Sequence, residues 1–428
     1  MPKIYNSTIL TLAAVQLIQS IAMGLPMSFF PNYAISLGAT VASIGVFTSS
    51  FMLSFAIMAP RMGTLSDKYG RKKVMILGIA ADIALGIATG LSPSWEWLLI
   101  IRFANGAVSG GAMLAAEALL QDNVEPSQRG EAAGFIMAAS MVGRNIGPLI
   151  GGAVQWFGLN TLSLGTLWSY RIPYFVDSGF SVLLIIMVYI WIKEPKEHHE
   201  LRIKAQAISG DLKITGSMRV LQVNAFMTGI GVGFIMPIMV LFFNDKFGMD
   251  ALEIGAIMSI SGMIGLVASF TAGRVADKVG RKPMIGAGNY LSQLFGFILP
   301  FTGDPAQASI AMSARSLGFN VSQPAFQALR ADLVAPQHRG KFFGLMSRYF
   351  TAGDVIGPII GAWLYDTYRN EVFYVAGVTV PGIGITFFIN SLIGVVGTTM
   401  LMLLVREPKP NERAGRLPIV EVLGGNED

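Results

Sequence analysis

The 428-residue sequence contains no cysteine and few charged residues, and each shortage excludes some classes of protein. Without cysteine the chain has no disulfide, no thiol nucleophile and no cysteine-ligated zinc or iron–sulfur cluster. Its three histidines, His198, His199 and His338, all lie among charged residues of expected loops, which excludes an intramembrane histidine metal site or proton relay. We therefore expect neither a metal nor a cofactor.

The shortage of charge is the signature of a membrane protein. Charged residues make up 13% of the sequence and hydrophobic residues 53%, whereas a soluble domain has about 25% charged residues. Five long runs contain no Asp, Glu, Lys or Arg: residues 4–60, 220–244, 254–273, 283–303 and 372–405. Because roughly 20 apolar residues cross a bilayer as a helix, each run is long enough for at least one span.

The apolar runs and the charges between them predict an all-α polytopic protein with twelve membrane helices. They lie near residues 8–36, 41–61, 74–91, 97–120, 131–157, 173–192, 220–243, 251–272, 284–302, 305–330, 342–366 and 378–405. Most Lys and Arg residues then fall in the terminal segments and alternate loops, with only Arg171, Lys246 and Arg369 in the opposite loops. The positive-inside rule predicts that both termini are cytoplasmic, in the cell membrane. Because the net charge of +5 is spread between spans, it does not indicate a nucleic-acid partner.

The two halves of the sequence repeat each other at an offset of 210 residues. Among the matches, Gly63 recurs as Gly273, Asp67-Lys68 as Asp277-Lys278, and Gly147-Pro148 as Gly357-Pro358. A repeat with an even number of spans keeps its orientation, so we expect two pseudo-symmetric six-helix bundles related by an axis along the membrane normal. The expected bundles are residues 1–192 and 220–405, with a cytoplasmic linker at 193–219 and a polar tail at 406–428.

A glycine-rich, charged motif follows the second and the eighth predicted helix. The first copy contains Gly63, Asp67, Gly70, Arg71 and Lys72. Glycine permits a tight turn, and the Asp67 carboxylate can accept charge-assisted hydrogen bonds from Arg71. On this motif and its second copy the chain resembles the major facilitator superfamily.

That resemblance implies a conformational latch at the cytoplasmic ends of the helices. The acid that the superfamily places at the end of helix 4 matches Asp122, and its counterpart in the second half is Asp332. The latch would comprise Asp67, Arg71 and Asp122, with a weaker copy made of Asp277, Arg281 and Asp332. A static basic anchor or loop cap would use the same residues without any switching.

The fifth predicted helix resembles the signature of twelve-helix drug/proton antiporters. The pattern g-x-x-x-G-P-x-x-G-G is matched by Gly143, Arg144, Gly147, Pro148, Gly151 and Gly152. Glycines four residues apart let helices approach closely, and proline removes a backbone hydrogen bond and bends the span. The segment would then seal or hinge one side of a cavity, although a generic contact between small residues explains it too.

Intramembrane charges are the candidates for proton coupling. Arg102 matches the R-F-x-x-G pattern of helix 4, whose arginine the family ties to proton coupling. We expect Asp354 and Glu117 to carry the proton, because burial and a nearby arginine shift a carboxyl group in opposite directions. Asp82 and Asp177 are weaker candidates, since the resemblance places their helices at the periphery.

The resemblance places helices 1, 4, 7 and 10 around a substrate cavity. Helix 1 has no acid, unlike helix 1 of many proton-coupled exporters of this type. The sequence therefore does not identify the residue that couples transport to protons. The polar residues expected at the cavity, which are equally suited to contacts between helices, are Gln16, Gln19, Asn105, Asn224, Arg315, Asn320 and Gln323.

The preferred function is proton-coupled export of amphipathic organic compounds or drugs by alternating access in a monomer, with sodium as the other possible ion. Uptake or exchange of a small organic anion is the alternative, because Arg102 and Arg315 would face each other across the cavity. A sensor that keeps the fold without transport is a third class. The chain lacks a G-x-x-x-x-G-K-[ST] loop and any nucleophile–base constellation, so neither an ATP-driven pump nor an enzyme is expected.

Overall fold

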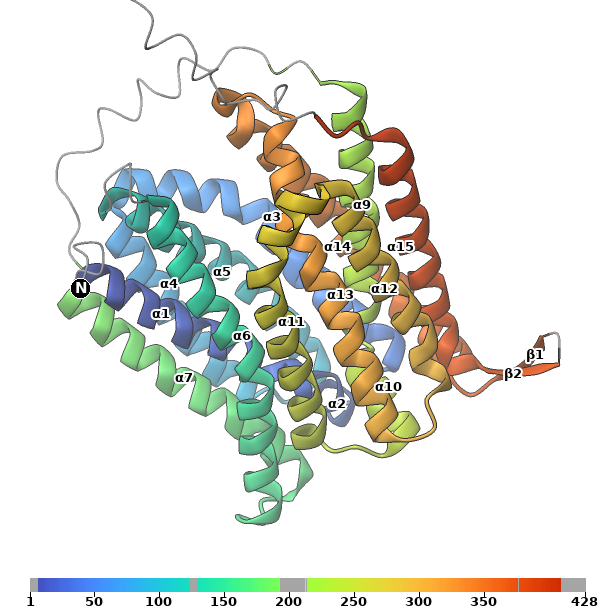
Figure 1. The fold of residues 1–428 in the computed structure, drawn as a ribbon. Helices are drawn as coiled ribbons and strands as arrows, with labels where there is room; N and C mark the ends of the chain where they lie inside the picture. Colours follow the sequence, from blue (N-terminus) through green and yellow to red (C-terminus); the bar gives the residue numbers. More distant parts are fainter. Residues whose placement is uncertain (1–6, 124–128, 193–211, 213, 376, 409–428) are drawn as a thin grey trace, which may run out of the picture.

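The computed structural model describes residues 7–123, 129–192, 212, 214–375 and 377–408, and these residues form long packed helices (Figure 1). The first half contains α1 (Ser7–Gly24), η1 (Leu25–Ser28), α2 (Phe30–Ser36), α3 (Val41–Tyr69), α4 (Arg71–Gly90), α5 (Trp95–Asn123), α6 (Arg129–Asn160) and α7 (Gly165–Trp191). The second half contains α9 (Gly216–Ile235), α10 (Met239–Phe247), α11 (Ala251–Val279), α12 (Arg281–Ile298), η2 (Leu299–Phe301), α13 (Pro305–Asp332), η3 (Pro336–His338), α14 (Arg339–Tyr368), η4 (Gly382–Gly384) and α15 (Ile385–Leu404).

Eight segments in the described residues are long and apolar enough to cross a membrane. Four further helices, α5, α12, α13 and α14, have comparable length and pack among them. This arrangement confirms the all-α polytopic fold. The first and seventh predicted spans are each broken, because Pro26 in η1 and Pro237 between α9 and α10 remove backbone donors.

Three predicted boundaries need correction. Helix α9 begins at Gly216, inside the predicted linker, where the Thr215 side chain accepts a hydrogen bond from Met218 N and caps the helix. Residues 378–405 are not one helix, since β1 (Val372–Val375) pairs antiparallel with β2 (Val378–Pro381) before α15. The β-branched residues of both strands and Gly377, at φ +81°, favour this hairpin. Arg406 and Glu407 of the predicted tail form hydrogen bonds with Ser217 and Arg281 of the second half.

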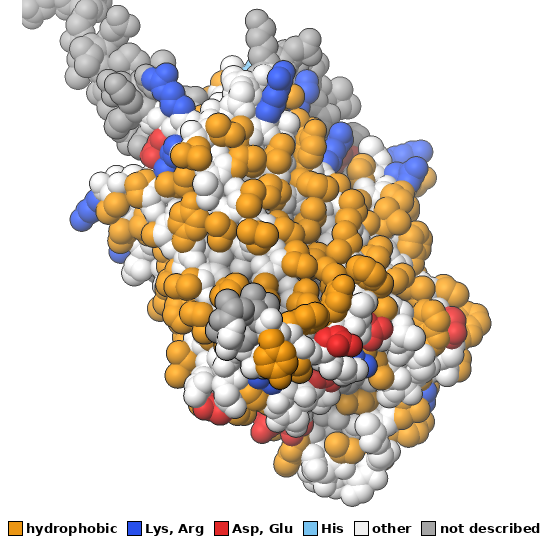
Figure 2. Space-filling view, turned by 90° about the vertical axis from the view of Figure 1, so that its right-hand side faces the viewer, with side chains coloured by type: hydrophobic (Ala, Val, Ile, Leu, Met, Phe, Trp, Pro, Cys, Tyr) orange, Lys and Arg blue, Asp and Glu red, His pale blue; other side chains and the backbone are white. Residues whose placement is uncertain are grey.

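The molecule has two ends that differ in charge. Figure 2 shows a broad hydrophobic band, with Lys and Arg gathered toward the end where α9 begins and α15 ends (Figure 1) and Asp and Glu toward the other end. We call these ends the terminal face and the opposite face. Such a band matches the hydrocarbon layer of a bilayer, bounded by polar surface on both sides.

Three hydrophobic clusters form the core, and only one of them joins the halves. The shared cluster lies toward the opposite face and includes Phe29, Phe47, Phe242 and Tyr365. Toward the terminal face each half has a cluster of its own, one around Met75 and Val188 of the first half and the other around Leu221 and Phe342 of the second. The halves are therefore packed together at the opposite face.

Candidate functional site

The glycines of α6 bring it into backbone contact with the first span. Gly143 lies against the Leu17 carbonyl, and Gly151 against the carbonyl of Leu25 in η1. A Cβ at Gly147 would lie 2.6 Å from the Ile21 oxygen, closer than side chains tolerate. These three positions, four residues apart, form one face of the helix, as the sequence predicted.

Pro148 and its neighbours connect α6 to the other half. The Pro148 carbonyl accepts a hydrogen bond from Ser28 Oγ at 2.9 Å and also lies against Gly255 of α11. Leu149 N donates to Ser259 Oγ of α11 at 3.1 Å. The segment around the proline thus holds the first span on one side and α11 on the other.

The last glycine of the motif has a different partner from the first three. Gly152 lies against the Ala251 carbonyl at the start of α11. In the second half, Gly353, Gly357 and Gly361 lie on α9 in the same manner, and Ala362, which replaces the final glycine, is fully buried. The methyl group of Ala362 is therefore accommodated at the position equivalent to Gly152.

Pairs of positions on α3 and α11 show that the halves separate toward the terminal face. Gly45 and Gly63 are about five turns apart and therefore share a face of α3. Gly45 lies against the Pro358 backbone of α14, whereas a Cβ placed at Gly63 would meet no described atom within 4 Å beyond the backbone of its own helix. On α11, Gly255 contacts α6, but Gly273 has only a side chain of its own half nearby.

The same spacing gives the same result on α6 and α14. Gly134 lies about five turns from Gly152, and Gly344 about five turns from Ala362. A Cβ placed at Gly134 or at Gly344 would meet no atom of another helix within 4 Å in the described part of the chain, whereas Gly152 and Ala362 are packed. The four helices α3, α6, α11 and α14 thus contact the other half near the opposite face and are separated from it near the terminal face.

The first copy of the predicted latch lies in a one-residue turn between α3 and α4. Gly70 has φ +98°, a conformation that favours glycine. The buried Arg71 lies 3.6 Å from the Asp67 carboxylate, between Nη2 and Oδ1. Lys72 Nζ donates to the carbonyls of Tyr189 and Ile192 at the end of α7, so it stabilises the C-terminus of that helix. Asp122 lies outside the described side chains.

The second copy is organised around a different ion pair. Arg281 Nη1 is paired with Asp332 Oδ2, and the Glu407 carboxylate accepts hydrogen bonds from the backbone nitrogens of Arg281 and Lys282 at 3.0 and 3.1 Å. Asp277 is exposed and makes no ion pair with any residue that the structure describes. Sequence reasoning missed Glu407, although the matching Glu-Pro-Lys at 194–196 and 407–409 was a signal for it.

The structure places Asp354 and Arg144, which hold equivalent positions in the repeats, in different surroundings. Asp354 is buried, and a Cβ at Gly233 of α9 would lie 3.0 Å from its Oδ1. Arg144 is exposed. Neither forms an ion pair within the described part of the chain.

Arg102 and Arg315 each point into their own bundle. The Arg102 guanidinium stacks on the Phe30 ring of α2, 3.9 Å from its centroid. Arg315 lies toward α12, since a Cβ at Gly296 would be 3.4 Å from its Nε. The prediction that the two arginines face each other across a cavity therefore does not describe this conformation, because aromatic and small residues of neighbouring helices accept their side chains.

The predicted polar cavity residues have mixed placements. Asn224 Nδ2 donates to the Gly397 carbonyl of α15 at 2.9 Å, and the Asn320 side chain lies against Gly265 of α11. Gln19 Oε1 and Asn105 Oδ1 are buried without a hydrogen-bond partner in the described residues. No polar contact is found for the half-buried Gln16 and Gln323 in the same residues, and Glu117 lies outside the described side chains.

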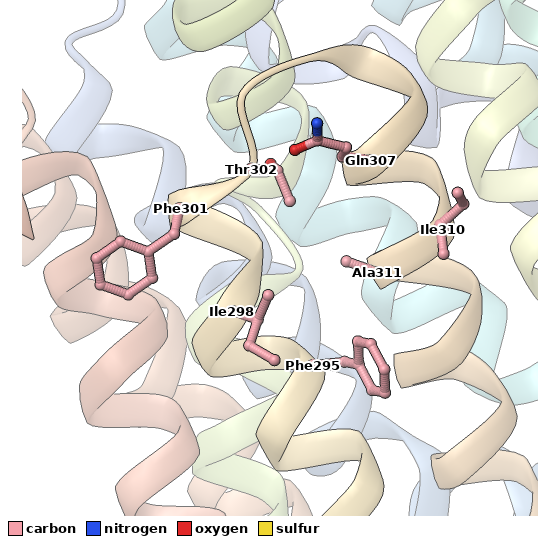
Figure 3. A pocket seen from close by; sticks show the side chains of 7 residues that line it. All are labelled: Phe295, Ile298, Phe301, Thr302, Gln307, Ile310 and Ala311. Carbon is pink, nitrogen blue, oxygen red and sulfur yellow. The ribbon is translucent and has the colours of Figure 1, made fainter.

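A separate pocket of about 260 Å³ lies between α12 and α13 near the opposite face (Figure 3). Phe295, Ile298, Ile310 and Ala311 supply most of its lining, with Thr302 and Gln307 at one end. It contains no charged side chain and belongs to one half, so we do not assign the intramembrane chemistry to it. In the part of the chain that the structure describes, no cluster of His, Asp and Glu has the geometry to hold a metal ion.

The repeated six-helix halves, packed at one membrane face and separated at the other, define a polytopic helical membrane protein of the two-bundle transporter class. The family model of the Major Facilitator Superfamily matches the sequence twice, over residues 12–223 and 221–421, and the chain belongs to this superfamily.

Relatives and solved structures agree with this assignment. The chain is 26% identical to "Multidrug resistance protein 2" of Bacillus subtilis over 379 residues, covering 86% of this chain and 91% of the relative. It is also 26% identical to "Multi-drug resistance efflux pump PmrA" of Streptococcus pneumoniae over 373 residues, covering 84% and 90%. Its fold matches a bacterial homologue of the human lysosomal transporter Spinster, with TM-score 0.78, 15% identity and coverage of 96% and 99%. A D-xylose–proton symporter matches with TM-score 0.74, 17% identity and coverage of 94% and 98%.

Proposed function

We propose that this protein is a secondary transporter that exports amphipathic organic compounds or drugs in exchange for protons, by alternating access. The observation that carries the proposal is the contrast along single helix faces, because Gly45 is packed against α14 while a Cβ placed at Gly63, on the same face, would meet no described residue of another helix. Two rigid bundles that touch at one face need only rock to open that face and close the other. The bundles would be residues 1–192 and 220–405, joined by the linker at 193–219.

The terminal face would be cytoplasmic. The distribution of Lys and Arg in the sequence supports this orientation, and Figure 2 shows the same bias on one side of the molecule. The conformation described would then be open to the cytoplasm, in the cell membrane, and we propose a monomer. On rocking, Gly63 and Asp67 would approach α14, and the network of Asp67, Arg71, Asp122 and its copy would act as the latch.

Proton coupling would use an intramembrane carboxyl group. Asp354 supports this role because it is buried at the contact between α14 and α9, one turn before Pro358 inside α14. A change of its charge would change the cost of burying it, and so bias the conformation of α14. Glu117 and Arg102 remain the other candidates, and sodium remains the alternative ion.

The substrate class rests on the relatives named as multidrug proteins and on the composition. The chain has 23 methionines and 27 phenylalanines, which suit an adaptable apolar binding surface. The alternative, uptake or exchange of a small organic anion, loses its specific support in this conformation, because Arg102 and Arg315 both point into their own bundles.

The test is transport in proteoliposomes. Cationic, neutral and anionic compounds are supplied with a pH gradient present or collapsed, and proton flux is recorded together with compound flux. Gradient-dependent movement of lipophilic cations or neutral compounds with opposite proton flux is expected. Movement restricted to anions, or independence from the gradient, would contradict the proposal, and a sodium gradient in place of the pH gradient identifies the ion.

A further inference from the structure

Two acids whose helices the resemblance placed at the periphery lie on neighbouring helices inside the first bundle. Asp82 lies on α4 and Asp177 on α7, two helices in close contact. Ser181, one turn after Asp177, donates a hydrogen bond from Oγ to Asp82 Oδ2 at 3.2 Å. Ser178 donates to the carbonyl of Ile83 at 3.3 Å, which holds the two helix faces together at this level. Asp82 is thereby fixed beside the turn of α7 that begins with Asp177.

Both acids have the same positively charged neighbour, Arg102. Asp82 and Asp177 interact electrostatically with each other, and Arg102 of α5 interacts with both. Asp177 Oδ1 is buried and has no hydrogen-bond partner in the described residues, and the same is true of the Tyr174 hydroxyl. A buried, ionised carboxylate without a donor is costly, whereas the neutral acid is not.

Among the side chains that the structure describes, the remaining surroundings of the two acids supply no second cation. The other titratable groups described beside the two acids and Arg102 are Tyr174 of α7 and Tyr33 of α2. Arg171, which precedes Tyr174 on α7, contacts instead the Ser92 carbonyl and Tyr33. The described residues of α1 and η1 carry no charge. Helix α6 also packs on α7, but its charged side chains Glu131 and Arg144 are exposed. Two carboxyl groups thus face one guanidinium group.

We infer that Asp82 and Asp177 form a carboxyl pair that shares one proton in this conformation and exchanges it during the transport cycle, with Arg102 as its counter-charge. One neutral acid and one carboxylate beside Arg102 leave the buried cluster without net charge, which is the least costly state in a medium of low dielectric constant. The pair is therefore a proton-binding site between α4 and α7, which are the third and sixth predicted spans.

The pair has a direct connection to the moving parts. Arg102 stacks on Phe30, which begins α2 immediately after the break at η1. Within η1, Leu25 contacts Gly151 and Ser28 donates to the Pro148 carbonyl of α6. A change in the charge of the pair would move Arg102, and with it the broken span that packs on the proline segment. The exchange step rests on the proposed proton coupling, whereas the shared proton does not.

Infrared spectroscopy of the purified protein at neutral pH tests the shared proton through the band of protonated carboxyl groups. Asp82→Asn and Asp177→Asn should each remove the same amount of this band, and the double variant should remove no more than either single variant. Arg102→Gln should double the contribution, because both acids then lose their counter-charge. Glu96→Gln is the matched control, since Glu96 is exposed and held by Ser94. Additive losses would show two independent acids, and no loss would show two carboxylates; either result overturns the inference.

Proton release on addition of tetraphenylphosphonium in weakly buffered solution tests the exchange. The wild-type protein should release protons, and both pair variants should release at least tenfold fewer. Release equal to wild type in both variants would contradict the exchange step. If the wild type neither binds nor moves the cation, the proposed function fails, while the infrared band still decides whether the pair holds a proton.

Discussion

Asp366 Oδ2 near the end of α14 accepts a hydrogen bond from the backbone nitrogen of Ala42 in the first turn of α3, at 3.2 Å. The bond crosses between the halves at the opposite face. Arg369 lies 3.7 Å from Asp366 and 3.3 Å from Asp245, so it ties this contact to the end of α10. The repeat places Trp156 where the first half would need the matching acid. The closure is therefore asymmetric, because the contact between α6 and α11 has no acid at the position equivalent to Asp366.

Replacing Asp366 should loosen the closed face. Asp366→Ala removes the side-chain acceptor of the Ala42 N–H, a hydrogen bond worth about 1 kcal/mol, and should shift the ratio of the two conformations roughly fivefold toward opening at the opposite face. Because the chain has no cysteine, spin labels on introduced cysteines report distances across each face without background. Asp304→Ala is the control, since Asp304 caps α13 within one half. An unchanged distance distribution would count against a gating role for the contact.

Bulky residues at the two glycines of α3 should have opposite effects. Gly45→Val cannot be accommodated against the Pro358 backbone and should favour the conformation that is open at the opposite face. Gly63→Val fits the conformation described, because the position is open, and should favour it if rocking brings Gly63 to α14. Labelling of introduced cysteines by a membrane-impermeant thiol reagent from each side measures both shifts. Shifts of the same sign would refute the rocking geometry.

Ending the chain at two nearby positions should separate the contribution of Glu407 from that of the tail. A chain ending after Val405 loses the carboxylate that binds Arg281 N and Lys282 N, and each charge-assisted bond contributes about 1.5–3 kcal/mol. Its melting temperature in detergent should fall by several degrees, whereas a chain ending after Pro408 should keep the wild-type value. Equal melting temperatures would mean that the bonds add no stability.

Asp354→Asn should uncouple transport from the pH gradient. The amide keeps the size of the buried side chain but cannot bind and release a proton. Accumulation driven by the gradient should fall at least tenfold, while exchange of labelled for unlabelled substrate continues. Asp304→Asn, which preserves a helix cap outside the bundle contact, is the control. Undiminished driven accumulation would remove Asp354 from the coupling path.

Much of this molecule was predictable because its signals are local or periodic. Charge-free runs, one-residue turns at Gly70 and Gly280, and the 210-residue offset follow from bilayer thickness and backbone sterics, and they indicated the helices and the family resemblance. The spacing of Gly143, Gly147 and Gly151 likewise predicted one close-packed face.

The sequence by itself thus determined that the chain crosses the membrane repeatedly, as two related halves with matched motifs at equivalent depths. Only the tertiary structure decided which residues meet. It turned Arg102 and Arg315 into their own bundles, placed Asp82 beside Asp177, and closed one membrane face while leaving the other open. The physical reason is that helix periodicity fixes the face on which a residue lies, whereas the rotation and tilt of each helix depend on packing among all its neighbours.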